Sequence, residues 1–322
     1  MRQRLRKIGR AVLVLAAAAA VITGVCVWVF CWKIDRSFRC VEVPKDPARW
    51  QVVRDIDSDG KKSTRFDLYL PQPPDPSRNY SLILYIHGGS FTHGDKREGR
   101  HICPYYASKG IVAASINYTL YSGRGSATLF SLYDEIIAST HAVKAYCAEH
   151  GYNITEMAFT GFSAGGYAAL VGAYKNPGAA AVPVKFVFQQ SGPASFEPEL
   201  WGRKSKRRQA AFISLLTGKK FTADDVGTEA FREAVDAVSP AAMVTANTVP
   251  TVLAYGPKDF RVPPAQKFPL LEKLKEYNVP HDYIEFPHSG HRLFHADDLD
   301  RMEVYFKTVD DYIARYFENA GK

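Results

Sequence analysis

The chain has 322 residues, 46% hydrophobic and 23% charged, which is typical of one large globular domain or two small ones and excludes a disordered or fibrous protein. Its formal charge of +8 comes from two short clusters, five basic residues among the first ten and five between Arg203 and Arg208. Without them the body carries a charge of −2, so the composition predicts no nucleic-acid-binding surface.

The N-terminal segment predicts a membrane anchor. Residues 1–10 are basic, and residues 11–32 contain no charge. A run of about 22 uncharged residues is long enough to cross a bilayer as a helix, and Trp28 and Trp32 stand at its far end, as interfacial aromatic residues do. We therefore predict a transmembrane signal anchor at residues 11–32, with the lipid bilayer as a partner, followed by a polar linker at residues 33–49.

The charges on either side of this span predict its orientation. Five basic residues precede the span and three follow it before residue 40, so the positive-inside rule places the N-terminus in the cytoplasm. Residues 50–322 are then extracytoplasmic. The alternative is a cleaved signal peptide, with the small residues at 18–20 as the cleavage site and a secreted protein as the product.

Residues 50–322 begin with a predicted β-hairpin. Its strands are Trp50–Ile56 and Thr64–Leu70, which are rich in β-branched and aromatic residues. The acidic residues of the intervening turn resemble the opening of a calcium-binding loop. The twelfth position of that loop is Phe66 instead of the required Glu, so we expect an ordinary turn and no metal.

The apolar run Tyr80–Ile86 predicts a strand that is buried on both faces. It leads into His87-Gly88-Gly89-Ser90-Phe91, where the glycine pair lets the backbone approach a ligand closely. We expect His87 to be structural. Further strands and helices alternate after this loop, which predicts a parallel sheet covered on both faces. The strands are Ile111–Ile116, Met157–Thr160, Val184–Gln189, Val249–Gly256 and His281–Phe286, and the helices are Leu129–His150, Pro269–Tyr277 and Leu299–Phe317.

The segment at residues 192–238 interrupts this alternation and predicts a cap over the carboxyl edge of the sheet. It contains two short helical patterns, near Ala210–Leu216 and Thr228–Ala237, and the basic cluster at residues 203–208. The basic cluster has two interpretations. It is either a solvated helix face or a binding surface for acidic substrates or an anionic polymer.

The sequence Gly161-Phe162-Ser163-Ala164-Gly165-Gly166 lies between a predicted strand and a predicted helix. A serine on such a sharp turn has a strained backbone, and its neighbours must lack bulk, as Gly161 and Gly165 do. The turn exposes the Ser163 hydroxyl and points the first amides of the helix at the reaction centre. This pattern predicts that Ser163 is a nucleophile.

Two partners for Ser163 follow in the chain, Asp259 and His291, each just after a predicted strand. Imidazole can take the serine proton near neutral pH and return it to a leaving group, and a buried carboxylate orients the imidazole. Alternative choices are His288 and His295 for the base, and Asp282 and Asp236 for the acid. The order Ser, Asp, His favours Ser163, Asp259 and His291 as a catalytic triad.

From Trp50 to its end the chain resembles the esterase and lipase branch of the α/β-hydrolases, nearest to its feruloyl-esterase-like, hormone-sensitive-lipase-like and kynurenine-formamidase-like groups. The motifs that carry the resemblance are His87-Gly88-Gly89-Ser90-Phe91, Gly94-Asp95-Lys96, Gly161 to Gly166, Ser239-Pro240, Gly256-Pro257-Lys258-Asp259, Val262-Pro263 and His291. Two positions depart from the pattern. Many relatives have a third Gly at Ser90, and hormone-sensitive-lipase relatives usually have an acid at Phe162.

The resemblance implies an α/β-hydrolase fold, with a mostly parallel sheet, helices on both faces and a small helical cap, here preceded by the transmembrane helix. It implies a serine hydrolase that cleaves carboxylic esters through an acyl-enzyme intermediate and needs no metal or cofactor. The expected oxyanion hole is formed by Gly88, Gly89, Ser90 and Ala164. The expected contacts to a small-molecule or polymer-linked ester are Phe91, Phe162, Trp201 and Phe212. The alternatives are a peptidase, a thioesterase or an arylformamidase with the same triad, and a non-catalytic binding module.

Overall fold

The computed structural model describes residues 48–57, 59–122 and 127–319. The expected anchor at residues 11–32 lies outside this part of the chain, as does most of the expected linker. Among the helices that the structure describes, none has the length and apolar character needed to cross a membrane.

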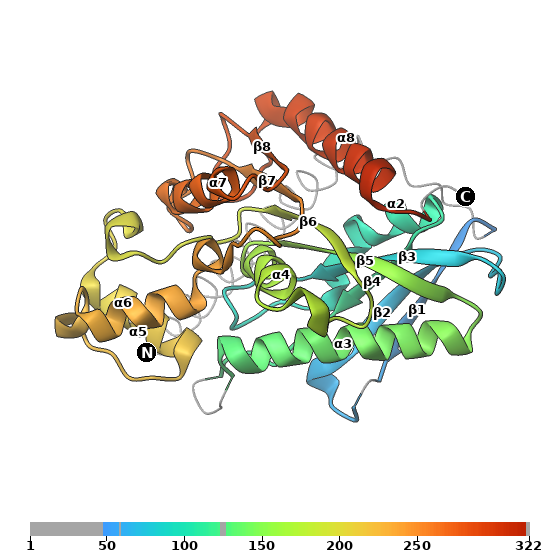
Figure 1. The fold of residues 1–322 in the computed structure, drawn as a ribbon, viewed down its shortest axis with the longest axis horizontal. Coiled ribbons are helices and arrows are strands. Elements are labelled where there is room, and N and C mark those ends of the chain that lie inside the picture. The colour runs from blue at the N-terminus through green and yellow to red at the C-terminus, as the bar shows by residue number, and fades with distance from the viewer. Residues whose placement is uncertain (1–47, 58, 123–126, 320–322) are drawn as a thin grey trace, which may run out of the picture. The chain divides into compact units, whose positions relative to one another are not determined.

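A mixed sheet of eight strands forms the centre of the described domain (Figure 1). Its order is β1-β2-β4-β3-β5-β6-β7-β8, and only the pairs β1/β2 and β2/β4 are antiparallel. The strands are β1 (Trp50–Ile56), β2 (Phe66–Pro71), β3 (Asn79–Ile86), β4 (Val112–Ile116), β5 (Asn153–Phe162), β6 (Val184–Gln190), β7 (Thr251–Tyr255) and β8 (His281–Glu285). The expected mostly parallel sheet is therefore confirmed, with the predicted hairpin as its antiparallel edge.

Helices cover both faces of this sheet. On one face α3 (Leu129–Glu149) packs beside α4 (Ala164–Tyr174), and α4 contacts β3, β5 and β6 (Figure 1). On the other face α2 (Cys103–Ser108) meets α8 (Leu299–Tyr316) through the rings of Tyr105 and Phe306, whose centres are 5.9 Å apart. A further helix, α7 (Lys267–Glu276), joins β7 to β8. Both faces of the sheet are thus apolar, which explains why the central strands read as continuous hydrophobic runs.

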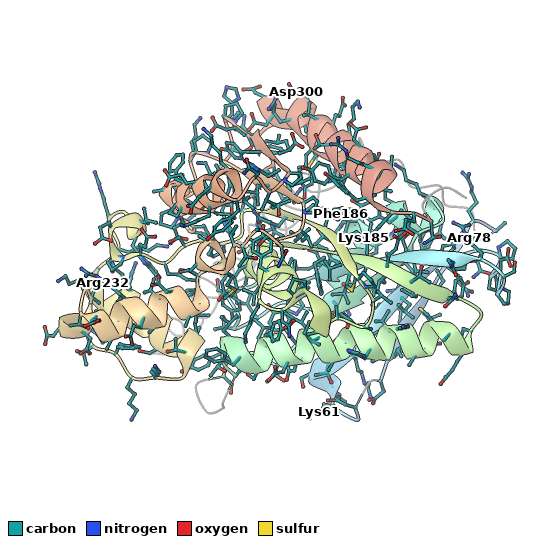
Figure 2. The ribbon with its side chains drawn as sticks, viewed as in Figure 1. Lys61, Arg78, Lys185, Phe186, Arg232 and Asp300 are labelled. Carbon is teal, nitrogen blue, oxygen red and sulfur yellow. The ribbon has the colours of Figure 1, made fainter. Side chains whose placement is uncertain are left out.

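The side chains of β6 show how the sheet divides interior from surface. Phe186 is fully buried, and its ring stacks on Phe188 and meets Tyr312 of α8. The neighbouring Lys185 reaches the edge of the domain and pairs with Glu318 (2.6 Å). Figure 2 shows both residues on β6, and shows Arg232 and Asp300 at the periphery.

The segment at residues 192–238 carries two helices, α5 (Lys206–Thr217) and α6 (Glu229–Val238), close to the helical patterns expected from the sequence. In Figure 1 they lie beyond the carboxyl ends of β5 and β6. Most of the basic cluster at 203–208 is exposed, while Lys204 is half-buried. Helix α5 begins within this cluster and buries Ala210, Ile213 and Leu216 on its opposite side.

Candidate active site

Ser163 lies on a sharp turn between β5 and α4. Its φ of 56° and ψ of −121° are rare for a residue with a side chain. The turn presses α4 against β3, and a Cβ atom at Gly165 would collide with the carbonyl oxygen of Ile86. Glycine at this position therefore allows the close approach that places the Ser163 hydroxyl just beyond the end of the strand.

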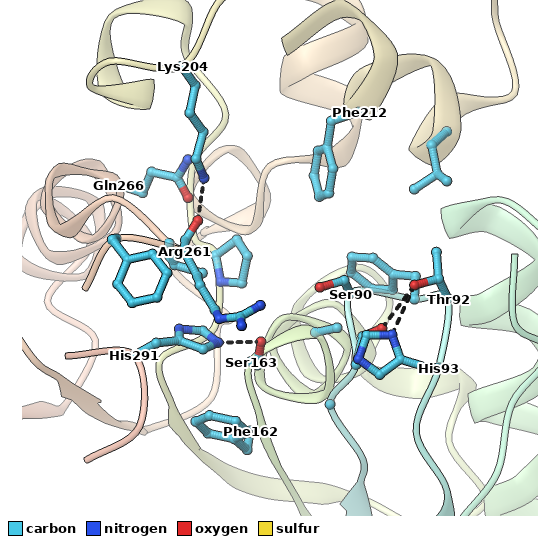
Figure 3. Close-up of a pocket in the computed structure, with 18 of the residues that line it drawn as sticks. Ser90, Thr92, His93, Phe162, Ser163, Lys204, Phe212, Arg261, Gln266 and His291 are labelled. Carbon is cyan, nitrogen blue, oxygen red and sulfur yellow. Dashed lines mark hydrogen bonds between the residues drawn. The ribbon is translucent and has the colours of Figure 1, made fainter. Parts of the chain in front are cut away.

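A continuous hydrogen-bond chain joins Ser163, His291 and Asp259. The Ser163 Oγ lies 2.8 Å from His291 Nε2 (Figure 3), and His291 Nδ1 lies 2.7 Å from Asp259 Oδ2. All three residues are at most 9% exposed. Both contacts are satisfied when neutral His291 carries its proton on Nδ1. Nδ1 then donates to Asp259, and Nε2 accepts a hydrogen bond from the Ser163 hydroxyl. The other carboxylate oxygen, Asp259 Oδ1, accepts from the backbone N–H groups of Arg261 (2.8 Å) and Val262 (2.9 Å).

The alternative bases lie outside this chain of contacts. His288 donates from Nδ1 to Asp298 Oδ1 (2.9 Å), and His295 is exposed and accepts from the N–H of Asp297 through its Nδ1 (3.3 Å). The alternative acids, Asp282 in β8 and Asp236 in α6, are both exposed.

Asp298 is a supporting residue that the sequence analysis missed. Its buried carboxylate accepts from the N–H and Nδ1 of His288 and from the hydroxyl of Ser289 (2.5 Å). Burial by itself raises the pKa of Asp298, but these hydrogen bonds outweigh it and hold the pKa below its ordinary value. The carboxylate therefore fixes the loop that presents His291, and the only signal in the sequence was an acidic pair just before the last helix.

The loop after β3 faces Ser163 with unusual backbone geometry. Gly89, Ser90 and Phe91 all have positive φ, at 115°, 53° and 64°. The Gly88 N–H lies 3.4 Å from Glu98 Oε2 and already has an acceptor. The Ala164 N–H opens α4, where a helix leaves its first amides without an intrahelical partner. These facts favour Gly89, Ser90 and Ala164 over Gly88 as donors to a developing oxyanion.

His87 has a structural environment, as the sequence analysis expected. Its ring stacks on Tyr118 with 4.3 Å between centres, and its Nδ1 donates to the Gly88 carbonyl (2.7 Å). Tyr118 in turn donates from its hydroxyl to the His87 carbonyl (3.1 Å). Burial lowers the pKa of His87, so the ring is neutral at neutral pH and supports the loop without a charge.

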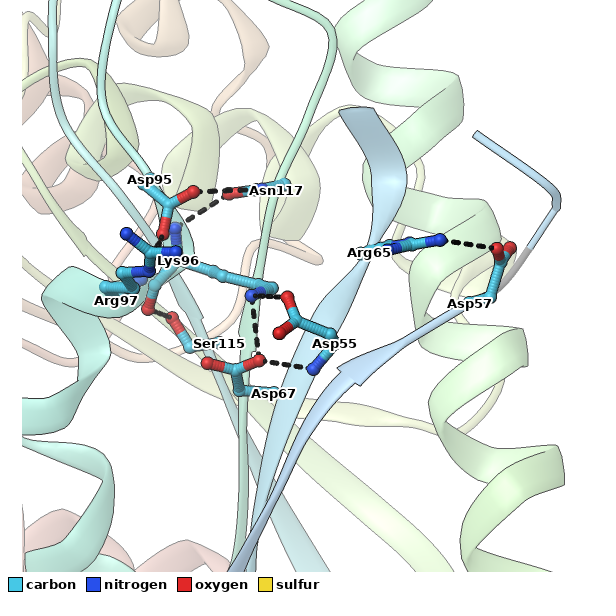
Figure 4. A network of polar contacts seen from close by, with 9 residues as sticks. All are labelled: Asp55, Asp57, Arg65, Asp67, Asp95, Lys96, Arg97, Ser115 and Asn117. Atoms are coloured by element: carbon cyan, nitrogen blue, oxygen red, sulfur yellow. Dashed lines mark hydrogen bonds and ion pairs between the residues drawn. The ribbon is translucent and has the colours of Figure 1, made fainter. Parts of the chain in front are cut away.

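A buried ion-pair network holds the far end of this loop (Figure 4). Lys96 is 3% exposed, and its ammonium donates to Asp55 Oδ1 (2.7 Å) and pairs with Asp67 Oδ1 (2.9 Å). Burial alone lowers the pKa of Lys96, and the two carboxylates more than reverse that effect. The Lys96 N–H also donates to Asn117 Oδ1 (2.7 Å). The network thus ties the segment after Gly94 to β1, β2 and the end of β4.

A cavity of about 630 Å³ opens over Ser163 and His291. Aromatic rings form one wall, where the Phe212 ring lies 5.4 Å from Phe196, 5.5 Å from Trp201 and 6.2 Å from Phe91. The four expected contact residues, Phe91, Phe162, Trp201 and Phe212, all line the cavity. Several other lining residues were not predicted from the sequence, among them Phe196, Glu98, Arg261 and Arg292.

Within the described residues, His288, His295 and Asp297 are brought together closely enough to share a metal ion, with ligand atoms within 4.8 Å of one another. All three side chains are exposed. None of them belongs to the hydrogen-bond chain of Ser163.

The sheet order, the turn at Ser163 and the contacts of His291 define an esterase-like α/β-hydrolase. Comparison with known families gives the particular group, because residues 66–274 match the model of the BD-FAE family. The chain belongs to this family, and the resemblance to serine esterases is confirmed.

Solved structures share this fold. Esterase B from Lactobacillus rhamnosis has a TM-score of 0.67 and 19% identity, over 92% of this chain and 96% of that one. The esterase Est2 from Thermogutta terrifontis has a TM-score of 0.65 and 18% identity, over 87% of this chain and 98% of that one. A truncated carbohydrate esterase from gut microbiota has a TM-score of 0.66 and 17% identity, over 83% and 99%.

Among curated proteins, dipeptidyl aminopeptidase BIII from Pseudoxanthomonas mexicana is similar in sequence. It is 25% identical over 260 residues, which are 76% of this chain and 35% of that protein. The chain therefore spans about a third of the length of this relative.

Proposed function

We propose that the protein is a serine hydrolase that cleaves carboxylic esters through an acyl-enzyme intermediate. The observation that carries this proposal is the buried hydrogen-bond chain from Ser163 through His291 to Asp259. As Ser163 Oγ attacks the ester carbonyl carbon, its proton passes to His291 Nε2, and Asp259 stabilises the resulting imidazolium. The carbonyl oxygen becomes an oxyanion, which the N–H groups of Gly89, Ser90 and Ala164 stabilise.

The intermediate then collapses and the bond to the alcohol oxygen breaks. The leaving alcohol takes the proton from His291 Nε2, and the acyl group stays on Ser163 Oγ. A water molecule next gives a proton to His291 and attacks the acyl carbon. Collapse of this second intermediate releases the carboxylic acid, and Ser163 recovers its proton.

A fluorophosphonate probe tests the nucleophile directly. It should label the wild type and fail to label Ser163→Ala. Ser191→Ala is a matched control, because Ser191 is also buried, also follows a strand and also has a positive φ (52°). Labelling should persist in this control. Labelling of Ser163→Ala, or loss of labelling in Ser191→Ala, would contradict the assignment.

A peptidase is the second candidate, because the curated relative is a dipeptidyl aminopeptidase. An aminopeptidase must bind the protonated amino group of its substrate, which calls for carboxylates in the cavity. Among the described lining residues Glu98 is the one carboxylate, and burial raises its pKa. Four cations line the same cavity. This balance of charge favours an ester over a peptide amino terminus, and a dipeptide para-nitroanilide assayed beside para-nitrophenyl esters distinguishes the two activities.

We further propose that residues 11–32 anchor the enzyme in a bilayer, with residues 50–322 on the extracytoplasmic side. The uncharged span and the excess of basic residues before it support this topology. Protease added to sealed spheroplasts should then digest the catalytic domain. Digestion only after lysis would reverse the orientation, and a mature N-terminus near residue 21 would show a secreted enzyme.

A further inference from the structure

The cavity over Ser163 has a strong excess of positive charge. Its described lining includes four lysine and arginine side chains, Lys204, Arg208, Arg261 and Arg292, against the single carboxylate of Glu98. The nearby Asp259 carboxylate, which is held by His291 and two backbone N–H groups, offsets part of this charge and by itself raises the pKa of Lys204. A concave site lined by charges of one sign concentrates ligands of the opposite sign.

The cations are not spread evenly around the cavity. Arg261 lies two residues after Asp259, and Arg292 directly follows His291. The Arg292 guanidinium lies 5.8 Å from the centre of the Phe162 ring, and that ring lies 5.2 Å from the imidazole of His291. Figure 3 shows Arg261 pointing into the cavity between Lys204 and His291. Two of the four cations, Arg261 and Arg292, therefore lie on the loops that carry the acid and the base.

Lys204 connects this charged side to the segment at residues 192–238. Its ammonium donates to the carbonyl of Arg261 and lies 5.6 Å from the centre of the Trp201 ring. Lys204 is half-buried, and burial lowers its pKa, so this ammonium is held partly away from water, whereas Arg261 and Arg292 are exposed. An anion that enters the cavity would compensate the loss of hydration at Lys204 and meet the two exposed guanidinium groups as well.

The side of the cavity near His291 receives the alcohol portion of an ester, because the base must reach the departing alcohol oxygen to return its proton. The aromatic wall formed by Phe91, Phe196, Trp201 and Phe212 is apolar and suits the acyl portion. We propose that the natural substrate is an ester of an apolar acid with an alcohol that carries an anionic group, bound by Arg261 and Arg292 with Lys204 beside them. This inference rests on the proposed esterase function and specifies its substrate class.

Two synthetic esters with one acyl group test the inference. Meta-butyryloxybenzoate carries a carboxylate on its alcohol portion, and meta-butyryloxybenzamide is a neutral analogue of similar shape. The ratio of their kcat/KM values is measured and divided by the ratio of their alkaline hydrolysis rates without enzyme, which removes the difference in leaving-group reactivity. The corrected ratio should favour the carboxylate ester in the wild type. It should fall as ionic strength rises from about 0.01 M to about 0.3 M, because salt screens exposed charges.

The variants Arg261→Gln and Arg292→Gln should each lower this ratio about threefold to fivefold, the range of a partly solvated ion pair. Arg207→Gln is the matched control, because Arg207 belongs to the same basic cluster as Lys204 but does not line the cavity. Its ratio should equal that of the wild type. A second readout uses the products, since meta-hydroxybenzoate should protect Ser163 from the fluorophosphonate probe better than meta-hydroxybenzamide.

The outcomes separate this inference from the proposed function. If the probe labels Ser163 while the corrected ratio stays at one in the wild type and in both arginine variants, the substrate class is wrong and the esterase assignment stands. An equal decrease of the corrected ratio in Arg207→Gln would also overturn the inference. It would show that the preference comes from the overall positive charge of the protein surface and not from the cavity. If the wild type hydrolyses neither ester and Ser163 is not labelled, the proposed function fails and the inference fails with it.

Discussion

The indole ring of Trp201 meets the ring of Phe212 nearly edge-on, with 5.5 Å between centres and 74° between planes. Trp201 is buried, and its Nε1 donates to the carbonyl of Phe196 (2.9 Å). Phe212 is half-buried on α5. The segment at residues 192–238 thus contributes a rigid ring and a more exposed one to the same wall of the cavity, and the two should respond differently to truncation.

We predict that Phe212→Ala shifts the preference among para-nitrophenyl esters toward longer acyl chains, because it removes bulk from the wall. Trp201→Ala should produce the same shift and also destabilise the fold by about 3–5 kcal/mol, because it empties a buried site. Phe268→Ala is the control, since Phe268 is 52% exposed and does not line the cavity. A preference that stays flat from acetate to laurate in the Phe212 variant would show that this segment does not limit the acyl group.

The role proposed for Asp259 predicts the effect of Asp259→Asn. The amide should reverse the orientation of the His291 proton and lower kcat about 10⁴-fold, if the effect known for chymotrypsin-type triads applies here. Asp282→Asn, at an exposed position of β8, should leave kcat unchanged. Stopped assays on para-nitrophenyl butyrate measure both variants. A loss of less than tenfold in Asp259→Asn would show that another acid orients His291.

The backbone of the loop after β3 predicts a severe effect of Gly89→Ala. A Cβ at Gly89 would overlap the His93 carbonyl oxygen, so the loop and its amide must move. Loss of one oxyanion donor should lower kcat about 10²-fold to 10³-fold. Gly60→Ala is the control for conformational strain alone, because Gly60 also has positive φ (81°) but has open space around it. It should reduce stability by about 1 kcal/mol and leave kcat unchanged.

The network around Lys96 predicts that Lys96→Met destabilises the fold by about 3–5 kcal/mol, because the Asp67 carboxylate would stay buried without its cation. Asp55→Asn should have a smaller effect, since Asp55 is exposed and Lys96 keeps Asp67. Urea unfolding followed by tryptophan fluorescence measures both changes. Equal losses of unfolding free energy in Lys96→Met and Asp55→Asn would contradict the larger contribution expected from the buried pair of Lys96 and Asp67.

The lowered pKa of Asp298 predicts a dependence of stability on pH. A carboxylate with a depressed folded-state pKa stabilises the fold fully above its ordinary pKa of about 3.9, and this contribution is lost as the pH falls through the folded-state value. The difference in unfolding free energy between wild type and Asp298→Asn should therefore be largest near neutral pH and should shrink below pH about 4. Asp297→Asn, at the exposed neighbouring residue, should show no such trend. A difference that is constant with pH would assign the effect of Asp298 to packing.

Local patterns in the sequence were enough to predict most of the sheet and the turn at Ser163. Continuous apolar runs identify strands such as Tyr80–Ile86, because a strand buried on both faces has no polar side. Small residues around Ser163 identify the turn, because only they permit its close packing. Helix α2 was missed, since its six residues are too few to show a helical period.

The tertiary structure alone decided which charged side chains share the cavity. Arg261 and Arg292 stand 31 positions apart and belong to different loops, yet both line the site, together with Lys204 from a third segment. Asp298 likewise supports His288 from a position ten residues away. These long-range contacts depend on where the loops leave the sheet and how they fold back. The local hydrophobic periodicity of the sequence does not specify either of these. The sequence by itself determined the order and chemical types of the triad residues, while the packing of the loops determined the charge and shape of the cavity around them.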